Sequence, residues 1–214
     1  MSGELEIPEY GRENLLNLAG FYPAGGCLGP GRRAILWVQG CLMHCPGCVT
    51  PRMQPLIDRV WFDVAELAEI LGSIRDIEGV TVVGGEPFLQ ARALAQLFAL
   101  LRTRCRLTTM VYSGYTLDSL IASALASVQR LLGLTDILVD GPYRPELDFS
   151  QKWRGSENQI IHFLTPTYRE WQWVLQARER DIEIHVDGSG GALILGIPPR
   201  GFYDKLQAAG VALV

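Results

Sequence analysis

The sequence predicts an α/β protein with a mainly parallel sheet, followed by a smaller C-terminal α+β extension. Short apolar runs typical of buried strands alternate with amphipathic segments at helical spacing between about residues 34 and 140. Each strand-like run ends in a loop of glycine or polar residues, and the alternation stops near residue 163. Because alternating strands and helices favour a parallel sheet, we expect these loops to meet at the carboxyl edge and form the site.

The first half of the chain contains two such strand and helix units. Residues 34–38 form a short apolar run that leads into a loop rich in cysteine. Asp63 and Glu66 have the spacing of a capping box, and apolar residues follow at helical spacing as far as Ile74. Residues 80–83 read as the next strand. The helix expected after it has an inner stripe of Leu94, Leu97, Phe98 and Leu101.

Two further units follow in the same order. Residues 107–112 read as a strand, and Thr116 is placed to cap a helix that extends to Leu132. Residues 136–139 read as the fourth strand, which runs directly into Asp140. All four predicted strands therefore end in residues that can carry chemistry.

The pattern of alternating strands and helices changes after about Phe163. A core over residues 1–163 would carry an extension over residues 164–214, packed on that core. The elements expected in the extension are a helix over 166–179, hairpin strands over 182–186 and 192–195 around a glycine-rich turn at 187–191, and a short helix over 201–209.

Composition excludes several classes of protein. The chain has 214 residues, of which 48% are hydrophobic, and a net charge of −4, which disfavours nonspecific nucleic-acid binding. No apolar stretch approaches the ~20 residues of a membrane span, and the polar start lacks the features of a signal peptide. Five cysteines, three of them in one loop, favour metal binding in a reducing compartment. We expect a cytoplasmic protein that binds neither membranes nor nucleic acid.

Cys41, Cys45 and Cys48 are the most informative residues. Three thiolates on one tight loop suit a [4Fe–4S] cluster whose fourth iron stays open for a small molecule. A structural zinc site is the first alternative, with Cys27 as a possible fourth ligand. Dithiol exchange by Cys45 and Cys48, which have Cys-x-x-Cys spacing, is the second. The spacing favours the open cluster and leaves all three interpretations open.

Other candidate residues lie at the ends of the later strands. A turn of Gly84, Gly85, Glu86 and Pro87 follows the second strand, where a backbone carbonyl and the Glu86 carboxylate could receive an ammonium group. A plain strand-to-helix turn is the alternative for this motif. Ser113 and Asp140 follow the third and fourth strands, and a solvated turn is the alternative for Asp140.

Six blocks in this order resemble the radical S-adenosylmethionine (radical SAM) superfamily, most closely the activating enzymes of anaerobic ribonucleotide reductases. They cover roughly residues 20–163, and the resemblance implies a partial, open β/α barrel. The blocks are Gly29-Pro-Gly-Arg32, Gly40-Cys-Leu-Met-His-Cys-Pro-Gly-Cys48, Gly84-Gly-Glu-Pro87, Ser113-Gly-Tyr-Thr-Leu117, Asp136-Ile-Leu-Val-Asp-Gly-Pro-Tyr143 and Trp153-Arg-Gly-Ser-Glu-Asn-Gln159.

The resemblance also implies cofactors and roles. A [4Fe–4S] cluster on Cys41, Cys45 and Cys48 would cleave S-adenosylmethionine reductively and release a 5′-deoxyadenosyl radical that abstracts hydrogen. The 84–87 motif would bind the methionine ammonium group, and Ser113 and Asp140 would meet ribose hydroxyls or the carboxylate. Three residues of the sixth block would contact S-adenosylmethionine or shape the substrate mouth, with loop hydrogen bonding as the alternative: Arg154, Ser156 and Asn158.

The resemblance implies a polypeptide substrate. In the activating family, the hydrogen atom comes from a glycine near the C-terminus of a large partner, and a flavodoxin or ferredoxin would donate the electron. Residues 164–214 do not match the compact activators, which leaves the substrate open, and two alternatives are kept. One is a maturase that acts on a ribosomal precursor peptide or another protein, with the extension binding that substrate or a helper subunit. The other is a noncatalytic iron–sulfur or zinc binding module.

Overall fold

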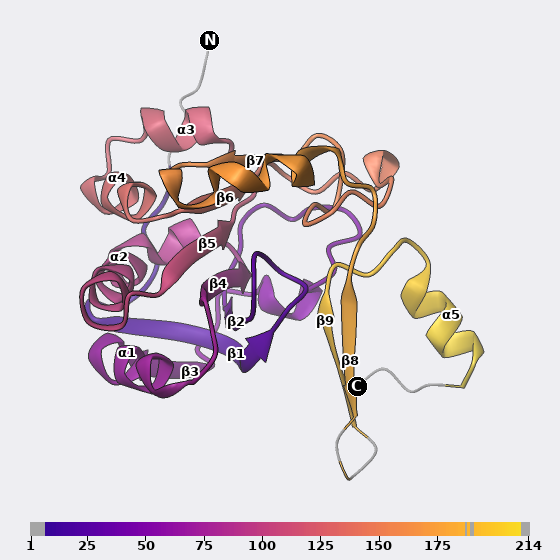
Figure 1. Ribbon diagram of the computed structural model, residues 1–214, viewed down its shortest axis with the longest axis horizontal. Helices are drawn as coiled ribbons and strands as arrows, with labels where there is room; N and C mark the ends of the chain where they lie inside the picture. Colours follow the sequence, from indigo (N-terminus) through magenta and orange to yellow (C-terminus); the bar gives the residue numbers. More distant parts are fainter. Residues whose placement is uncertain (1–6, 187, 189–190, 211–214) are drawn as a thin grey trace.

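The computed structural model describes residues 7–186, 188 and 191–210, and its centre is a seven-stranded sheet in the order β3-β1-β2-β4-β5-β6-β7 (Figure 1). The four central strands are parallel, while β1, β3 and β7 join them antiparallel. The predicted α/β class with a mainly parallel sheet is therefore confirmed. The strands are β1 (Leu15–Gly25), β2 (Arg33–Val38), β3 (Val60–Asp63), β4 (Gly79–Gly84), β5 (Thr108–Tyr112), β6 (Ile137–Asp140) and β7 (Ile160–Phe163).

The long strand β1 is not predicted from the sequence. Gly20 and Pro23 interrupt its apolar pattern, and both residue types normally indicate a turn. The structure accommodates them at two shifts of register against β2, one between Leu18 and Gly20 and one between Tyr22 and Gly25. Proline is tolerated in a sheet at such irregularities because no ladder hydrogen bond is lost there. β1 therefore covers an edge of β2 that local sequence patterns leave open.

Four helices lie along one side of the sheet (Figure 1). Their buried apolar residues form the largest core cluster with one face of β1, β2 and β4. Burial of apolar area of this kind is the main force that holds the layers together. The helices are α1 (Val64–Ser73), α2 (Ala91–Leu100), α3 (Leu117–Ala122) and α4 (Ala126–Gly133).

The single helix expected from Thr116 to Leu132 is wrong, because the chain breaks between α3 and α4. Ser123 has an extended backbone with φ −63° and ψ 130°. The Gln129 amide nitrogen donates to the carbonyls of Leu120, Ile121 and Ser123, at 2.9, 3.1 and 2.8 Å. This side chain satisfies the last carbonyls of α3, which no further helical turn reaches. A side chain from the next helix thus decides where α3 ends.

The start of α1 gives a first testable prediction. Asp63 caps the helix, since its Oδ1 accepts from the backbone N–H groups of Ala65 and Glu66 at 2.9 and 3.1 Å. We expect Asp63→Ala to lower the free energy of unfolding by about 1 kcal/mol in urea titrations, because two helix N–H groups lose their acceptor. Asp63→Asn should retain most of the stability. Glu69→Ala, at an exposed position in the same helix, is the matched control.

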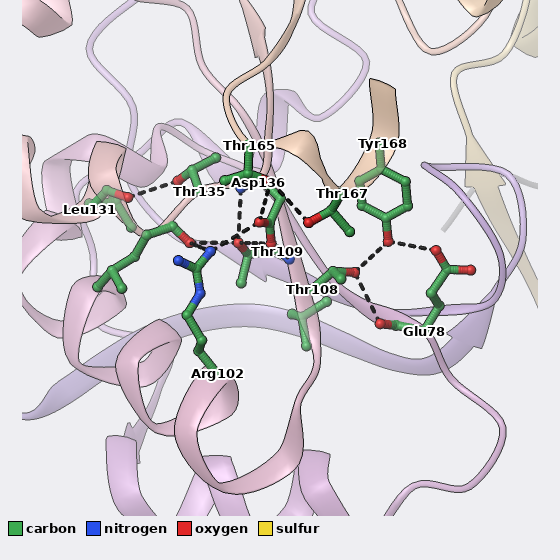
Figure 2. Close-up of polar contacts among 12 residues, drawn as sticks. Glu78, Arg102, Thr108, Thr109, Leu131, Thr135, Asp136, Thr165, Thr167 and Tyr168 are labelled. Carbon is green, nitrogen blue, oxygen red and sulfur yellow. Dashed lines mark hydrogen bonds and ion pairs between the residues drawn. The ribbon is translucent and has the colours of Figure 1, made fainter. Parts of the chain in front are cut away.

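The chain after residue 163 covers the other face of the sheet. The α-helix expected over 166–179 is instead 3₁₀-helical over Pro166–Gln176, with a nonhelical Tyr168 at φ −121° and ψ 25°. The Tyr168 hydroxyl lies 2.6 Å from both Thr108 Oγ1 and Glu78 Oε1 (Figure 2). These contacts pull Tyr168 towards the sheet and break the regular turn. Its ring packs with Trp153 and Trp171 over β5, β6 and β7.

The second link between this segment and the sheet is Asp136, at the amino end of β6. Its carboxylate accepts from the Thr109 backbone N–H at 2.9 Å and from the Thr165 hydroxyl at 2.8 Å, and it pairs with Arg102 at 3.0 Å (Figure 2). This network lies at the amino ends of β5 and β6, at the opposite end of those strands from the predicted site. It therefore anchors the extension and leaves the carboxyl edge free.

The predicted hairpin is confirmed as β8 (Ile182–Val186) and β9 (Ala192–Gly196), a separate two-stranded sheet that α5 (Phe202–Ala208) follows. Leu195 of β9 is buried against Cys27 and Ile35, and the Tyr22 hydroxyl lies 3.0 Å from His185 Nδ1. The hairpin and α5 lie on the opposite side of the sheet from α1 and α2 (Figure 1). Within the turn expected at 187–191, residues 187, 189 and 190 lie outside the described residues, as does the polar start at 1–6.

None of the helices in the described ranges is both long and apolar enough to span a membrane.

Candidate functional site

The residues singled out in the sequence follow four neighbouring parallel strands. Cys41 comes shortly after β2, Gly85 directly after β4 and Ser113 directly after β5, while Asp140 ends β6. Val38 at the end of β2 is in register with Gly84 at the end of β4. Since parallel strands end at one edge, the structure brings these residues to the same carboxyl edge of the sheet.

The cysteine loop begins on a backbone frame. The Gly40 N–H donates to the Met53 carbonyl and the Cys41 N–H donates to the Gln54 carbonyl, both at 2.8 Å. The buried Gln39 side chain donates to the Pro55 carbonyl at 2.6 Å. The segment after the third cysteine thus folds back and fixes the position of the first. This frame holds the loop independently of any bound group.

The three thiols are partly buried and lie in each other's electric field. Burial raises the pKa of Cys41 to about 11, and the nearby Glu86, Cys45 and Cys48 add to this rise, while a backbone hydrogen bond from Met43 at 3.4 Å opposes it. Cys41 therefore holds its proton at neutral pH when nothing is bound. Because a metal takes the thiolate, binding at this loop must release protons.

The donor set fits an iron–sulfur cluster better than a single metal ion. Among the described residues, no three His, Cys, Asp or Glu side chains converge closely enough to hold one ion, whereas a structural zinc site needs four such ligands. A cubane takes one thiolate on each iron, so its three sulfurs need not meet at a point. Cys27 is buried in a separate cluster against Ile35 and Leu195, so it supplies no fourth thiol.

Dithiol exchange fits the loop poorly. Burial raises the pKa of the Cys45 thiol, although the nearby backbone N–H of Tyr143 acts against this rise. Exchange of the thioredoxin type relies on a thiol whose pKa is lowered, because the thiolate is the attacking species. The environment of Cys45 therefore favours ligation of a metal centre over thiol exchange.

The two glycines after β4 permit a close approach to the cysteine loop. A Cβ on Gly85 would stand 2.2 Å from the Gly40 carbonyl oxygen, and Gly84 has a φ of +105°. The Gly85 N–H donates to the Val38 carbonyl and the Glu86 N–H donates to the Gly40 carbonyl, both at 2.8 Å. The Gly84 carbonyl accepts from the Thr50 hydroxyl at 2.9 Å. Most polar backbone groups here thus join two loops.

Glu86 is fully buried and ties the β4 loop to the β5 loop. Its Oε1 accepts from the Phe88 N–H at 2.9 Å and the Ser113 hydroxyl at 3.0 Å, and its Oε2 accepts from the Gly114 N–H at 2.8 Å. Burial raises the pKa of Glu86 to about 7 against the lowering effect of these three donors. An ionised carboxylate has about four acceptor sites, so capacity for one further donor, such as an ammonium group, remains. Pro87 follows as the first residue of a buried 3₁₀ turn.

Asp140 has a structural environment. Its carboxylate accepts from the Leu117 N–H at 2.5 Å and the Ile160 N–H at 3.2 Å, and it lies 3.2 Å from His162 Nε2. The interpretation as a solvated turn is wrong, because Asp140 is only 3% exposed. It joins the start of α3 to β7.

The sixth block makes mostly internal contacts. Arg154 donates to the carbonyls of Gln159 and Leu175 at 3.2 and 2.8 Å, and Ser156 Oγ accepts from the Arg144 N–H at 3.1 Å. Asn158 differs: its amide nitrogen donates to the Pro142 carbonyl at 2.8 Å, whereas its buried Oδ1 has no partner among the described residues. A buried acceptor without a donor is costly, so this oxygen suits a ligand hydroxyl.

One part of the site carries no signal in the sequence. Arg180 and Asp148 form an ion pair in which both side chains are 4% exposed, and the Tyr143 hydroxyl donates to Asp148. Tyr143 belongs to a recognised block, but no motif marks Asp148 or Arg180, which are 32 residues apart. Only the fold brings them together.

Comparison with known proteins agrees with this geometry. Residues 27–162 match the sequence model of a family described as a 4Fe-4S single cluster domain. The chain is 31% identical over 157 residues to the anaerobic ribonucleoside-triphosphate reductase-activating protein of Escherichia coli K12, and 34% identical over 159 residues to that of Pasteurella multocida. Each alignment covers 70% of this chain and 99% of the relative. The activating protein of Enterobacteria phage T4 is 26% identical over 151 residues, with 68% and 93% covered.

Proposed function

This chain belongs to the radical SAM family of anaerobic ribonucleoside-triphosphate reductase-activating proteins, and we propose from this premise that its substrate is an anaerobic ribonucleotide reductase. It is a radical SAM oxidoreductase whose cofactors are a [4Fe–4S] cluster and S-adenosylmethionine. The observation that carries the proposal is the coverage: nearly the whole length of the relatives aligns with this chain.

Reductive cleavage of S-adenosylmethionine at the cluster is the chemistry that these cofactors supply, and it yields the radical that takes a hydrogen atom from the substrate glycine. In our proposal, Cys41, Cys45 and Cys48 hold three irons. The three thiols are only partly buried, so a ligand can reach the loop, while backbone hydrogen bonds fix its start. A fixed loop would hold the cluster ligands in place before S-adenosylmethionine binds.

The remaining site residues divide into two groups in this proposal. Glu86, with Gly84, Gly85 and Pro87, would receive the methionine ammonium group at its open acceptor position, and Asn158 Oδ1 would accept a ligand hydroxyl. Ser113, Asp140, Arg154 and Ser156 already bond to the protein through their side chains. We propose that these four residues hold the cofactor-binding loops in position.

We further propose that residues 1–163 form the catalytic core and residues 164–214 an extension that supports it. The boundary is favoured by the end of β7 at Phe163 and by the end of the family match at residue 162. We propose a flavodoxin or ferredoxin as electron donor, and the cytoplasm as the compartment, because a reduced cluster and free thiols need reducing conditions.

A maturase of a peptide or another protein is the second candidate. The observation that favours it is the extension itself, which lies beyond the family match and exposes apolar side chains: Trp173, Leu175, Ile184, Val186 and Leu193. A substrate or helper subunit could bind such a surface. The cofactor chemistry would be the same.

The test is anaerobic reconstitution with iron and sulfide, followed by incubation with S-adenosylmethionine, dithionite and a purified anaerobic reductase. We expect 5′-deoxyadenosine and a glycyl-radical EPR signal that disappears when the acceptor glycine of the reductase is replaced by alanine. Cleavage without any radical on the reductase would favour the maturase. Cluster binding without cleavage would leave only the noncatalytic binding module.

A further inference from the structure

We propose that Arg180, in the extension, positions the cysteine loop through Asp148 and Tyr143. This inference rests on the assignment of Cys45 as a cluster ligand in the proposed function. Arg180 lies beyond residue 162, where the family match ends, so this link is an addition to the shared core. Three contacts form it.

The first contact is the ion pair of Arg180 with Asp148. Arg180 Nη2 lies 2.6 Å from Asp148 Oδ1, and Nη1 lies 3.3 Å from Oδ2. The remaining donors of the guanidinium group bond to the carbonyls of Gln151, Gly155 and Pro198, at 3.2, 2.7 and 3.3 Å. All five N–H groups therefore have acceptors. A buried pair this fully bonded fixes geometry more than it adds stability.

The second contact joins Asp148 to Tyr143. The Tyr143 hydroxyl donates to Asp148 Oδ2 at 3.3 Å, the same oxygen that faces Arg180 Nη1. Tyr143 follows Asp140 at the end of β6, so its backbone is placed at the carboxyl edge of the sheet. The hydroxyl fixes the direction of the ring, and the position of Asp148 therefore determines where the ring lies.

The third contact joins Tyr143 to the cysteine loop. The ring of Tyr143 lies against Gly47, between Cys45 and Cys48, where φ is +67°. If Gly47 carried a Cβ, that atom would stand 3.6 Å from Tyr143 Cε1. Gly47 stands in the turn that the Cys48 N–H closes by donating to the Cys45 carbonyl at 3.2 Å. Groups that orient the ligands of a metal centre are one means by which proteins set its potential. Arg180 thus acts on a cluster ligand without touching it.

The test compares Arg180→Met with Arg178→Met. Arg178 forms a surface pair with Glu157, in which the side chains are 60% and 49% exposed, so its loss should change little. In the protein without cofactors, we expect the Cys48 amide of Arg180→Met, which donates to the Cys45 carbonyl, to exchange hydrogen about tenfold faster, as for the weakening of one hydrogen bond. Amides of β4 and β5 should keep their protection.

The loaded protein gives a second readout. A loop that is held less firmly orients its thiolates differently. We expect the reduction equilibrium of the cluster to shift about tenfold, a change of ~59 mV in its potential for one electron. Arg178→Met should keep the wild-type potential. Neither measurement uses the reductase, so failure of the proposed substrate would not affect the result.

Tyr143→Phe keeps the inference testable if Arg180→Met fails to fold, which loss of protection in β4 and β5 would reveal. This variant retains the ring and the backbone N–H and removes only the hydroxyl that bonds to Asp148. We expect the same two changes in a smaller amount. Wild-type exchange at the Cys48 amide together with a wild-type potential, in a folded Arg180→Met protein or otherwise in Tyr143→Phe, would overturn the proposal.

Discussion

Cys45→Ala is expected to form no 5′-deoxyadenosine above background, a complete loss of activity. Cys45 is the middle thiol of the loop and lies within the field of Cys41 and Cys48. A cluster held by three thiolates on one loop has no spare ligand, because Cys27 is buried in a separate apolar cluster. Product analysis by chromatography, with iron and sulfide determination on the same sample, measures both consequences.

Cys105→Ala is the matched control for this loss. Cys105 is also a partly buried free thiol, but its Sγ lies near the Ala68 carbonyl, at 3.8 Å, far along the chain from the cysteine loop. We expect this variant to retain wild-type iron content and cleavage. Full turnover by Cys45→Ala would refute the assignment of its ligand role.

Glu86→Ala is expected to have the second largest effect, on stability and cofactor binding together. It leaves the N–H groups of Phe88 and Gly114 and the hydroxyl of Ser113 without their acceptor. At roughly 1–3 kcal/mol for each buried donor, the free energy of unfolding should fall by about 3 kcal/mol or more. Urea titration of the protein without cofactors measures this loss. Glu69→Ala, on the exposed face of α1, should leave stability unchanged.

Glu86→Gln keeps the shape of the side chain and removes its titration. The pH dependence of the free energy of unfolding therefore separates the two contributions. The pKa of Glu86 rises from 4.5 in the unfolded reference to about 7 in the folded protein, so the folded state binds the proton more tightly. Its contribution to stability is therefore full below pH 4.5 and is lost as the pH rises to 7, by about 3 kcal/mol. Glu86→Gln lacks this dependence, so its deficit relative to wild type should shrink between pH 5 and 7.5. A constant deficit would contradict the buried titration of Glu86.

The order of elements was predictable wherever neighbouring residues carry the signal. Asp63 begins α1 as its spacing to Glu66 predicts, and the hairpin strands appear within one residue of their predicted ends. The four parallel strands follow from their apolar runs and their polar ends. These features depend on local periodicity and on caps, which a short segment encodes by itself.

The candidate site was predictable in its composition and less so in its contacts. The cysteines and the motif at 84–87 were found from residue types and spacing. The hydrogen bonds by which the Glu86 carboxylate links two loops were not predicted, because its donors Ser113 and Gly114 follow the next strand. Likewise Asp140, which could be read as a turn residue, is buried by α3 and β7.

The sequence by itself determined the alternation of strands and helices, the thiol donor set and the family to which the chain belongs. Only the tertiary structure decided that β1 pairs across two shifts of register, that Tyr168 interrupts a helix and that Arg180 reaches Asp148. The physical reason is that periodicity, caps and motif spacing act within a few residues along the chain. Pairing of distant strands and bonding of buried polar groups depend on which partners the completed fold brings within hydrogen-bonding distance.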